Sequence, residues 1–219
     1  MRTIKKGKEP RVLVTYRKKD DATFNNLPGD VKKEIQDQLV REQHGLCCYC
    51  QSRIRASGDG MKVEHWQSQS PYKYPERQLD YSNMLGACCG GQKYGQKSSR
   101  EQHHCDTLKG DSDLCFSVCD SAHPIERKIQ FSSLGRISSD DPDIDDAINN
   151  VLNLNLSVLI ENRKRALTGF LEGLETVGTK KVDYVKELTR WDGSKSEELP
   201  PFSQIVVHYL MKKNKSVVS

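Results

Sequence analysis

Four cysteines have the type and spacing of a metal site. Two of them form a C-x2-C pair, in which both thiolates can bind one zinc ion. A tetrahedral site needs a second pair, which we predict from two cysteines further along the chain. Such a site would stabilise a small core by on the order of 10 kcal/mol. The predicted zinc ligands are Cys47, Cys50, Cys88 and Cys105.

The other cysteines leave alternatives open. Cys48 and Cys89 are bystanders in the predicted site, and all of these cysteines could instead be free thiols in the core. A separate metal site could use a C-x3-C-x3-H run, whose three ligands would share one face of a helix. Pro124 follows this run directly and argues against a full helix there. The ligands of this second candidate are Cys115, Cys119 and His123.

A carboxylate and an imidazole are neighbours at Glu64 and His65. At a strand end, the following turn can direct both side chains to one site. Glu64 would then bind a hard divalent cation such as Mg²⁺ or Mn²⁺ through oxygen. His65, neutral near pH 7, would take a proton from an attacking water. Taken alone, the pair is more often an exposed structural pair, so its context must decide.

The expected local structure places this pair at the end of a strand. Apolar and polar residues alternate over residues 61–66 well enough to predict a short strand. Residues 67–82 are rich in serine, glutamine, proline and tyrosine, which is typical of a loop. Residues 83–88 would return as ordered structure. A polar, basic loop follows, and a short helix could begin at Asp106. In that loop Lys93, Lys97 and Arg100 would contact phosphate or simply be solvated.

The segment before the first cysteines contains one clear helix. Residues 1–28 are expected to be extended or irregular, with a β-prone run at 12–16. Asp30 is a good N-cap for a helix over residues 31–44, and Gly45 suits the left-handed position that ends it. The chain would therefore enter the C-x2-C pair directly from a helix end.

The second half of the chain is expected to be mainly helical. A hairpin over residues 128–137 precedes a long apolar helical pattern, which an alternation at 152–156 would break into two helices. Further helices are expected at 184–190 and from Pro200 onward. The fold class is thus α+β and mainly helical. The expected divisions are a basic arm (1–28), a zinc-containing core (29–139) and a C-terminal helical region (140–219) that covers the core.

Charge and composition bear on the partners and the cellular location of the protein. Residues 1–19 hold eight lysines and arginines against Glu9 alone, as either a solvated arm or a contact for phosphate or a partner. No apolar run approaches about 18 residues, so no membrane span is expected. The N-terminus lacks the apolar region of an export signal, and eight cysteines without one favour metal ligands over disulfides. We expect a cytoplasmic location.

The order of the motifs resembles the HNH nuclease superfamily. It runs Cys47-x2-Cys50, Glu64-His65, Asn83-x4-Cys88 and Cys105-Asp106-x2-Lys109-Gly110. Members of this superfamily place a histidine base on one strand of a ββα-metal unit and a metal ligand on its helix. The resemblance therefore implies a small HNH core and hydrolysis of nucleic-acid phosphodiester bonds.

The resemblance also implies individual roles. His65 matches the general base and Glu64 the first ligand of the catalytic cation. Asn83 matches the middle asparagine, which orients the base or its loop. Asp106 stands where the family more often has histidine or asparagine. The second ligand of the catalytic cation therefore stays open between Asp106, His104 and His103.

A longer set of motifs extends to about residue 175. It comprises Glu42-Gln43-x3-Cys47-x-Tyr49-Cys50, Val63-Glu64-His65-Trp66, Asp80-Tyr81-x-Asn83, Cys88-x-Gly90, His104-Cys105-Asp106-x2-Lys109-Gly110 and Leu152-Asn153-Leu154-Asn155 with Arg163. This set resembles PtuB, the family of HNH subunits of Septu-type anti-phage systems, which also occur as effectors beside retrons. The resemblance implies a PtuA-type ATPase as partner. Beside a retron it also implies a reverse transcriptase with its msDNA.

We therefore predict a metal-dependent HNH endonuclease that acts in an anti-phage complex. DNA is the default substrate, and a structured RNA such as a tRNA stays open. The basic arm or the C-terminal helices would dock the ATPase. The alternative is a zinc-stabilised nucleic-acid-binding or adaptor module without hydrolytic activity. His65 discriminates between the two, because an adaptor has no need for an imidazole beside a carboxylate.

Overall fold

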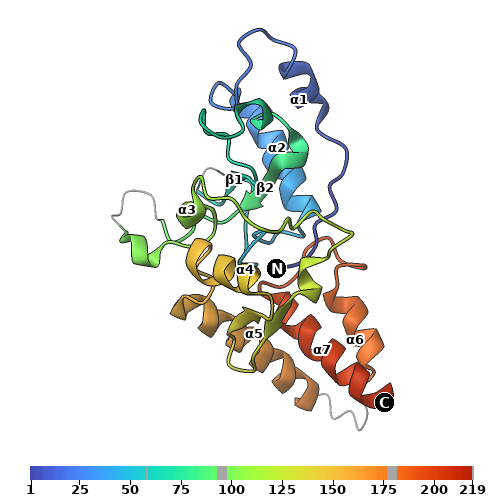
Figure 1. Cartoon of the computed structure of the whole chain (residues 1–219). Coiled ribbons are helices and arrows are strands. Elements are labelled where there is room, and N and C mark those ends of the chain that lie inside the picture. The colour runs from blue at the N-terminus through green and yellow to red at the C-terminus, as the bar shows by residue number, and fades with distance from the viewer. Residues whose placement is uncertain (58, 93–97, 177–181, 219) are drawn as a thin grey trace.

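The computed structural model describes residues 1–57, 59–92, 98–176 and 182–218 (Figure 1). Within them the chain forms helices and two small antiparallel sheets of two strands each, which confirms the predicted α+β class. In Figure 1 the first two helices lie at one end of the molecule and the last three at the other. None of the described helices combines the length and apolarity needed to cross a membrane.

The N-terminal segment differs from the prediction. The β-prone run at 12–16 lies in helix α1 (Arg11–Tyr16), so the expectation of extended structure was wrong. Leu13 and Tyr16 are three residues apart and both are buried, since a helical turn brings them onto one face against the core. Packing of this face overrides the β preference of the individual residues.

The basic segment at the start of the chain is not a free arm. Met1 and Ile4 are buried in the core, and the Ile4 N–H donates to the Val118 carbonyl. The Lys6 ammonium donates to the Met84 carbonyl at 2.9 Å and lies 3.0 Å from Glu42. Part of the charge counted in the sequence is therefore used inside the fold and is not offered to a partner.

Helix α2 (Gly29–Glu42) leads into the first cysteines, as predicted. Its N-cap is Pro28, however, and not Asp30 as predicted. Asp30 lies inside the first turn, where the positive end of the helix dipole stabilises its negative charge. The helix ends two residues earlier than expected, so His44 (φ 54°) takes the left-handed position directly after the C-cap, and Gly45 (φ 72°) follows in the same conformation. The Gln43 side chain then ties this turn to the sheet, since its amide nitrogen donates to the Leu46 and Gly86 carbonyls.

The predicted strand at 61–66 is β1 (Lys62–His65), and the segment after the loop is β2 (Met84–Ala87). The two strands are antiparallel, with His65 opposite Met84 and Lys62 opposite Ala87. Helix α2 packs against β2. The short helix expected from Asp106 is α3 (Asp106–Lys109). Two of these elements adjoin cysteines in the chain, because β2 ends just before Cys88 and α3 begins just after Cys105.

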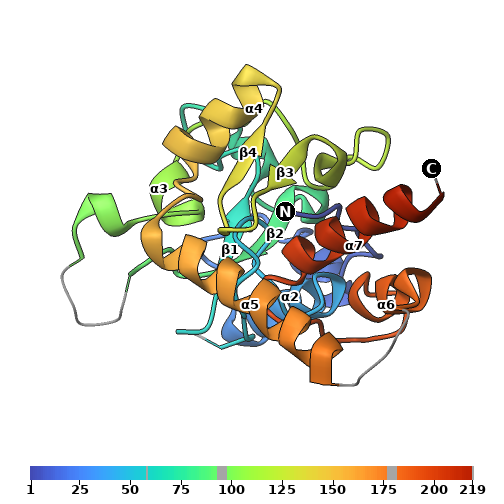
Figure 2. The same ribbon diagram turned by 90° about the horizontal axis from the view of Figure 1, so that it is seen from below.

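The second sheet and the remaining helices cover this core (Figure 2). The predicted hairpin is β3 (Ile129–Phe131) with β4 (Ile137–Ser139). The long helical pattern is broken as expected, since α4 (Pro142–Asp146) and a π-helical turn (Ala147–Val151) precede α5 (Ser157–Thr176). Helices α6 (Tyr184–Trp191) and α7 (Ser203–Val218) follow, and α7 packs against both α5 and α6.

The C-terminal region contacts the cysteine core directly. The Cys105 N–H donates to the Leu152 carbonyl at 2.9 Å, and the Phe202 N–H donates to the Gln51 carbonyl at 2.9 Å. Arg163 of α5 is buried and donates to the Gly135 and Leu154 carbonyls. The buried apolar side chains of the N-terminal segment, the core and the C-terminal helices form one continuous cluster.

Candidate metal and catalytic site

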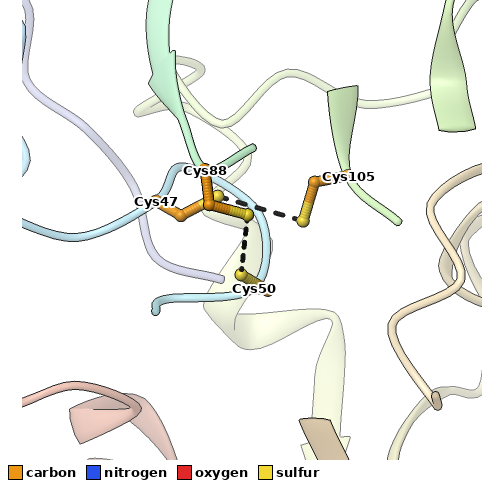
Figure 3. A group of neighbouring side chains, drawn as sticks. All are labelled: Cys47, Cys50, Cys88 and Cys105. Atoms are coloured by element: carbon orange, nitrogen blue, oxygen red, sulfur yellow. Dashed lines mark hydrogen bonds between the residues drawn. The ribbon is translucent and has the colours of Figure 1, made fainter. Parts of the chain in front are cut away.

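Four buried thiols lie close together, one from each of Cys47, Cys50, Cys88 and Cys105 (Figure 3). Their sulfur atoms all lie within 4.8 Å of one another, with Cys47 and Cys105 at 3.9 Å and Cys50 and Cys88 at 3.6 Å. A tetrahedral zinc with Zn–S bonds of 2.3 Å requires sulfur separations of roughly 3.8 Å. The four cysteines predicted as ligands are therefore placed as a zinc ion would need them.

The chemistry of these thiols also suits a cation. Burial, and after it the neighbouring Cys47 thiol, raise the pKa of Cys105 well above its ordinary value. Four thiolates at this spacing repel one another strongly in a medium without water, and a bound zinc ion removes that cost. Cys105 has a φ of 55°, a conformation that costs a non-glycine residue on the order of 1–3 kcal/mol. The cluster can hold a metal such as zinc.

The remaining cysteines lie outside this cluster, whereas the His104 Nδ1 approaches the sulfurs of Cys88 at 3.9 Å and Cys105 at 3.2 Å. Cys48 is buried beside it, and the Cys89 sulfur contacts the Asp59 carbonyl at 3.4 Å. The second candidate site is not assembled: in the described part of the chain the only gathered metal-binding group is the four-cysteine cluster. Cys115 is exposed, and His123 pairs with Asp120 at 2.9 Å instead.

Glu64 at the end of β1 is almost completely buried and has two donors on one oxygen. The Tyr49 hydroxyl donates to Oε1 at 2.8 Å, and the Lys109 ammonium lies 2.9 Å from the same atom. Burial, and then hydrogen bonding and charge from Asp106, raise the pKa of Glu64 well above its ordinary value. Glu64 and Asp106 are therefore two carboxyl groups that interact directly, and a divalent cation between them would relieve the repulsion of their ionised forms.

The three candidates for the second ligand of the catalytic cation have different surroundings in the structure. Asp106, the first residue of α3, lies beside Glu64 and keeps part of its side chain exposed. His104 instead places Nδ1 3.2 Å from the Cys105 sulfur. His103 pairs through Nε2 with the Ser98 hydroxyl at 2.7 Å. Of the three, Asp106 lies where a cation bound by Glu64 would find a second oxygen ligand.

His65 is held in one tautomer by the loop that follows β1. Its Nε2 lies 2.9 Å from the Gln78 carbonyl, which can only accept, so Nε2 carries the hydrogen and Nδ1 is the basic atom. The Phe24 ring packs edge-on against the imidazole with centroids 4.5 Å apart. Burial lowers the pKa of His65 below its usual 6.5. The imidazole is therefore neutral and oriented at neutral pH.

Asn83 closes the loop that carries Gln78. Its side-chain nitrogen donates to the Gln67 carbonyl at 2.9 Å and the Arg77 carbonyl at 3.3 Å, while its oxygen accepts from the Gln67 N–H at 2.8 Å. Asn83 is buried, so these bonds are shielded from water. These bonds go to residues of the loop, so the predicted role of Asn83 in orienting the base would be exerted through the loop.

An open pocket of about 830 Å³ joins these groups to the surface. Glu64, His65 and Asp106 line it, together with the first turn of α2, which contributes Lys32 and Lys33. Lys33 is paired with Asp37 at 2.6 Å, and both lysines are exposed. The pocket therefore combines an imidazole and three carboxyl groups, those of Glu64, Asp106 and Asp111, with the positive charge of its lysines.

Several residues of this site were not predicted. Tyr49 lies between Cys47 and Cys50, and Lys109 lies one helical turn after Cys105. Their positions within the motifs are the sequence feature that could have indicated a role for them in the site. No sequence feature indicated a place in the pocket for Lys32 and Lys33, because the position of α2 against β2 is decided by packing. Lys93 and Lys97 lie outside the described residues, and Arg100 is exposed.

The chain matches no protein-family model, and a search of the curated proteins found no match.

Proposed function

We propose that the chain is a metal-dependent endonuclease of the HNH class, which hydrolyses phosphodiester bonds of nucleic acid. One observation carries the proposal: a two-stranded antiparallel hairpin followed by a short helix directs an imidazole and two carboxylates into one open pocket. This is the order of elements and residue types that the resemblance to HNH nucleases implies for a ββα-metal unit. Lysines on the pocket wall favour a substrate that carries phosphate.

His65 has the geometry of a general base in this reaction. Nδ1 accepts a proton from the water that attacks phosphorus, while Nε2–H stays bonded to the Gln78 carbonyl and keeps the ring in place. As the bond from the water oxygen to phosphorus forms, the bond from phosphorus to the leaving oxygen breaks. The imidazolium that results is stabilised by the carbonyl dipole and by the nearby carboxylates.

Glu64 and Asp106 would hold the catalytic cation, Mg²⁺ or Mn²⁺. Carboxylate oxygens are the ligands that these hard cations prefer, and one or two carboxylates with water and phosphate oxygens complete such sites. When bound, the cation would stabilise the charge that develops on the phosphate and the leaving oxygen. Asn83 supports the base through the loop it closes.

The zinc cluster would hold these parts in register. Cys105 and Asp106 are adjacent, so the chain that binds zinc passes directly into the carboxylate position. We also propose, on the resemblance to PtuB, that the chain works with a PtuA-type ATPase in anti-phage defence. Where a retron is its neighbour, a reverse transcriptase with its msDNA would join the complex.

The test is cleavage by the parent chain and by His65→Ala, each with and without a co-expressed PtuA-type ATPase. DNA and tRNA are offered separately with Mg²⁺ or Mn²⁺. Loss of the general base should lower the cleavage rate by about 10²–10⁴-fold and leave the zinc content unchanged. His123→Ala, which removes an exposed histidine paired with Asp120, is the matched control and should cut at the parental rate.

Two outcomes would contradict the proposal. Cleavage by His65→Ala at the parental rate would remove this residue as the base. No cleavage of either nucleic acid by the parent chain, with the ATPase present, would leave the zinc-stabilised adaptor as the better description.

A further inference from the structure

The Glu64 carboxylate is held on a single oxygen by two buried donors. Both the Tyr49 hydroxyl and the Lys109 ammonium approach Oε1, at 2.8 Å and 2.9 Å. The Lys109 ammonium also donates to the His65 carbonyl at 3.2 Å. Glu64, Tyr49 and Lys109 are exposed by only 2%, 1% and 2%. Because water is excluded, these bonds are strong and fix the rotation of the carboxylate.

Both donors are positioned by the zinc cluster. Tyr49 lies inside the C-x2-C turn, between Cys47 and Cys50. Lys109 lies one turn along α3 from Cys105, and its N–H donates to the Cys105 carbonyl at 2.9 Å. The four thiols therefore determine where each donor stands, and so which oxygen of Glu64 is engaged.

The occupied oxygen limits how Glu64 can bind a cation. A cation that took both carboxylate oxygens would have to displace the buried hydroxyl and ammonium from Oε1. A cation that needs one oxygen can use Oε2 and leave both bonds intact. Ca²⁺ takes six to eight oxygens and often binds carboxylates through both, whereas Mg²⁺ demands near-ideal octahedral geometry and keeps several waters.

We propose that Tyr49 and Lys109 set the cation selectivity of the catalytic site by holding Glu64 as a one-oxygen ligand, which favours Mg²⁺ and Mn²⁺ over Ca²⁺. This inference rests on the proposed function, since it concerns the same carboxylates. Tyr49 and Lys109 are positioning residues, because they act on the cation through Glu64. Lys109 also offsets one of the two carboxylate charges, which limits non-selective attraction of any divalent cation.

The experiment measures cation binding by the zinc-loaded full chain without nucleic acid. Mn²⁺ binding is followed by electron paramagnetic resonance, and Ca²⁺ affinity by competition. Tyr49→Phe removes one buried bond to a charged group, so the ratio of Mn²⁺ to Ca²⁺ affinity should fall by roughly tenfold. Lys109→Met should lower the ratio further and raise the affinity for both cations. Zinc content and melting temperature report whether each variant is folded.

Tyr81→Phe is the matched control, because it also removes the hydroxyl of a buried tyrosine. The Tyr81 ring packs under Lys6 and not beside Glu64. Its affinity ratio should equal that of the parent. If Tyr49→Phe keeps zinc and its ratio stays within about twofold of the parent, the inference is wrong and the proposed nuclease is untouched. If the parent chain binds neither cation, or Asp106→Asn binds them equally well, the catalytic cation site itself is wrong and both proposals fall.

Discussion

The thiol cluster and the proposed carboxylate site of this small core differ in how much of a metal's ligand shell the protein supplies. The thiol cluster offers four buried ligands and is enclosed. The carboxylate site offers Glu64 and Asp106 and faces a pocket of about 830 Å³. Cys105 and Asp106 are neighbours in sequence, yet they serve different sites. A closed ligand shell is the mark of a structural metal, and an open one leaves room for water and substrate.

The two regions also neutralise their charge differently. In the thiol cluster four acidic groups face one another. Burial, and after it the Cys47 thiol, raise the pKa of Cys105, and the buried Arg163 guanidinium is a cation that acts on Cys50 and Cys105. The carboxylate site contains its own cation, since the Lys109 ammonium is paired with Glu64. On the proposed function, the first region depends on a metal for its stability, whereas the second can lose and regain its cation without unfolding. The proposed function thus assigns stability and chemistry to separate metals held by adjacent residues.

The largest effect should come from removing one ligand of the four-thiol cluster. Cys105→Ser removes a fully buried ligand, and a structural zinc contributes on the order of 10 kcal/mol, comparable to the whole stability of a domain. The variant should lose zinc and its cooperative thermal transition, measured by metal analysis and circular dichroism. Cys115→Ser, at an exposed cysteine, should keep both. A folded, zinc-free Cys105→Ser protein would show that the cluster is not structural.

A smaller effect is expected from the protonation of His65, which should change the cleavage rate and the stability with pH. Burial lowers the pKa of His65 below 6.5, so the base is neutral at pH 6.5 and cleavage should fall only at lower pH, by about tenfold per unit below that pKa. The unfolded state binds the proton more readily than the folded state. The stability from neutral His65 is therefore complete above pH 6.5 and is lost as pH falls through the folded pKa.

Two measurements check this pH dependence. A rate–pH profile at saturating Mg²⁺ should place the acid limb below 6.5, and a limb centred above 6.5 would contradict the buried, neutral base. Urea unfolding of the parent at several pH values should show a loss of stability below 6.5 that His65→Ala lacks.

The smallest effect should come from the pocket wall. Removing both charges with Lys32→Ala and Lys33→Ala should weaken nucleic-acid binding and reduce the slope of log affinity against log salt by about 1 to 2. Cleavage at saturating substrate should stay at the parental rate. The control is Lys164→Ala with Arg165→Ala, an exposed basic pair on α5 that does not line the pocket. An equal loss in the control would show that the pocket lysines have no special role.

Much of the local structure was predictable because its signals are short-range. The strand at Glu64, the helix starting at Asp106 and the break between the helices near Leu152 follow from alternation, turn residues and helix-compatible spacing. The β-prone run in α1 was assigned wrongly because its side chains are stabilised by contacts with distant residues. The basic arm was likewise drawn into the fold, since Met1 and Ile4 find apolar neighbours there.

The sequence by itself determined which residue types are available and in what order: the C-x2-C pair, the Glu64–His65 pair and the carboxylate after Cys105. Only the tertiary structure decided how they are used. It placed Asp106 rather than His103 or His104 beside Glu64, put the Gln78 carbonyl on His65, and brought both donors to one oxygen of Glu64. The physical reason is that these contacts join residues from separate elements, whose relative positions are determined by packing around the four thiols.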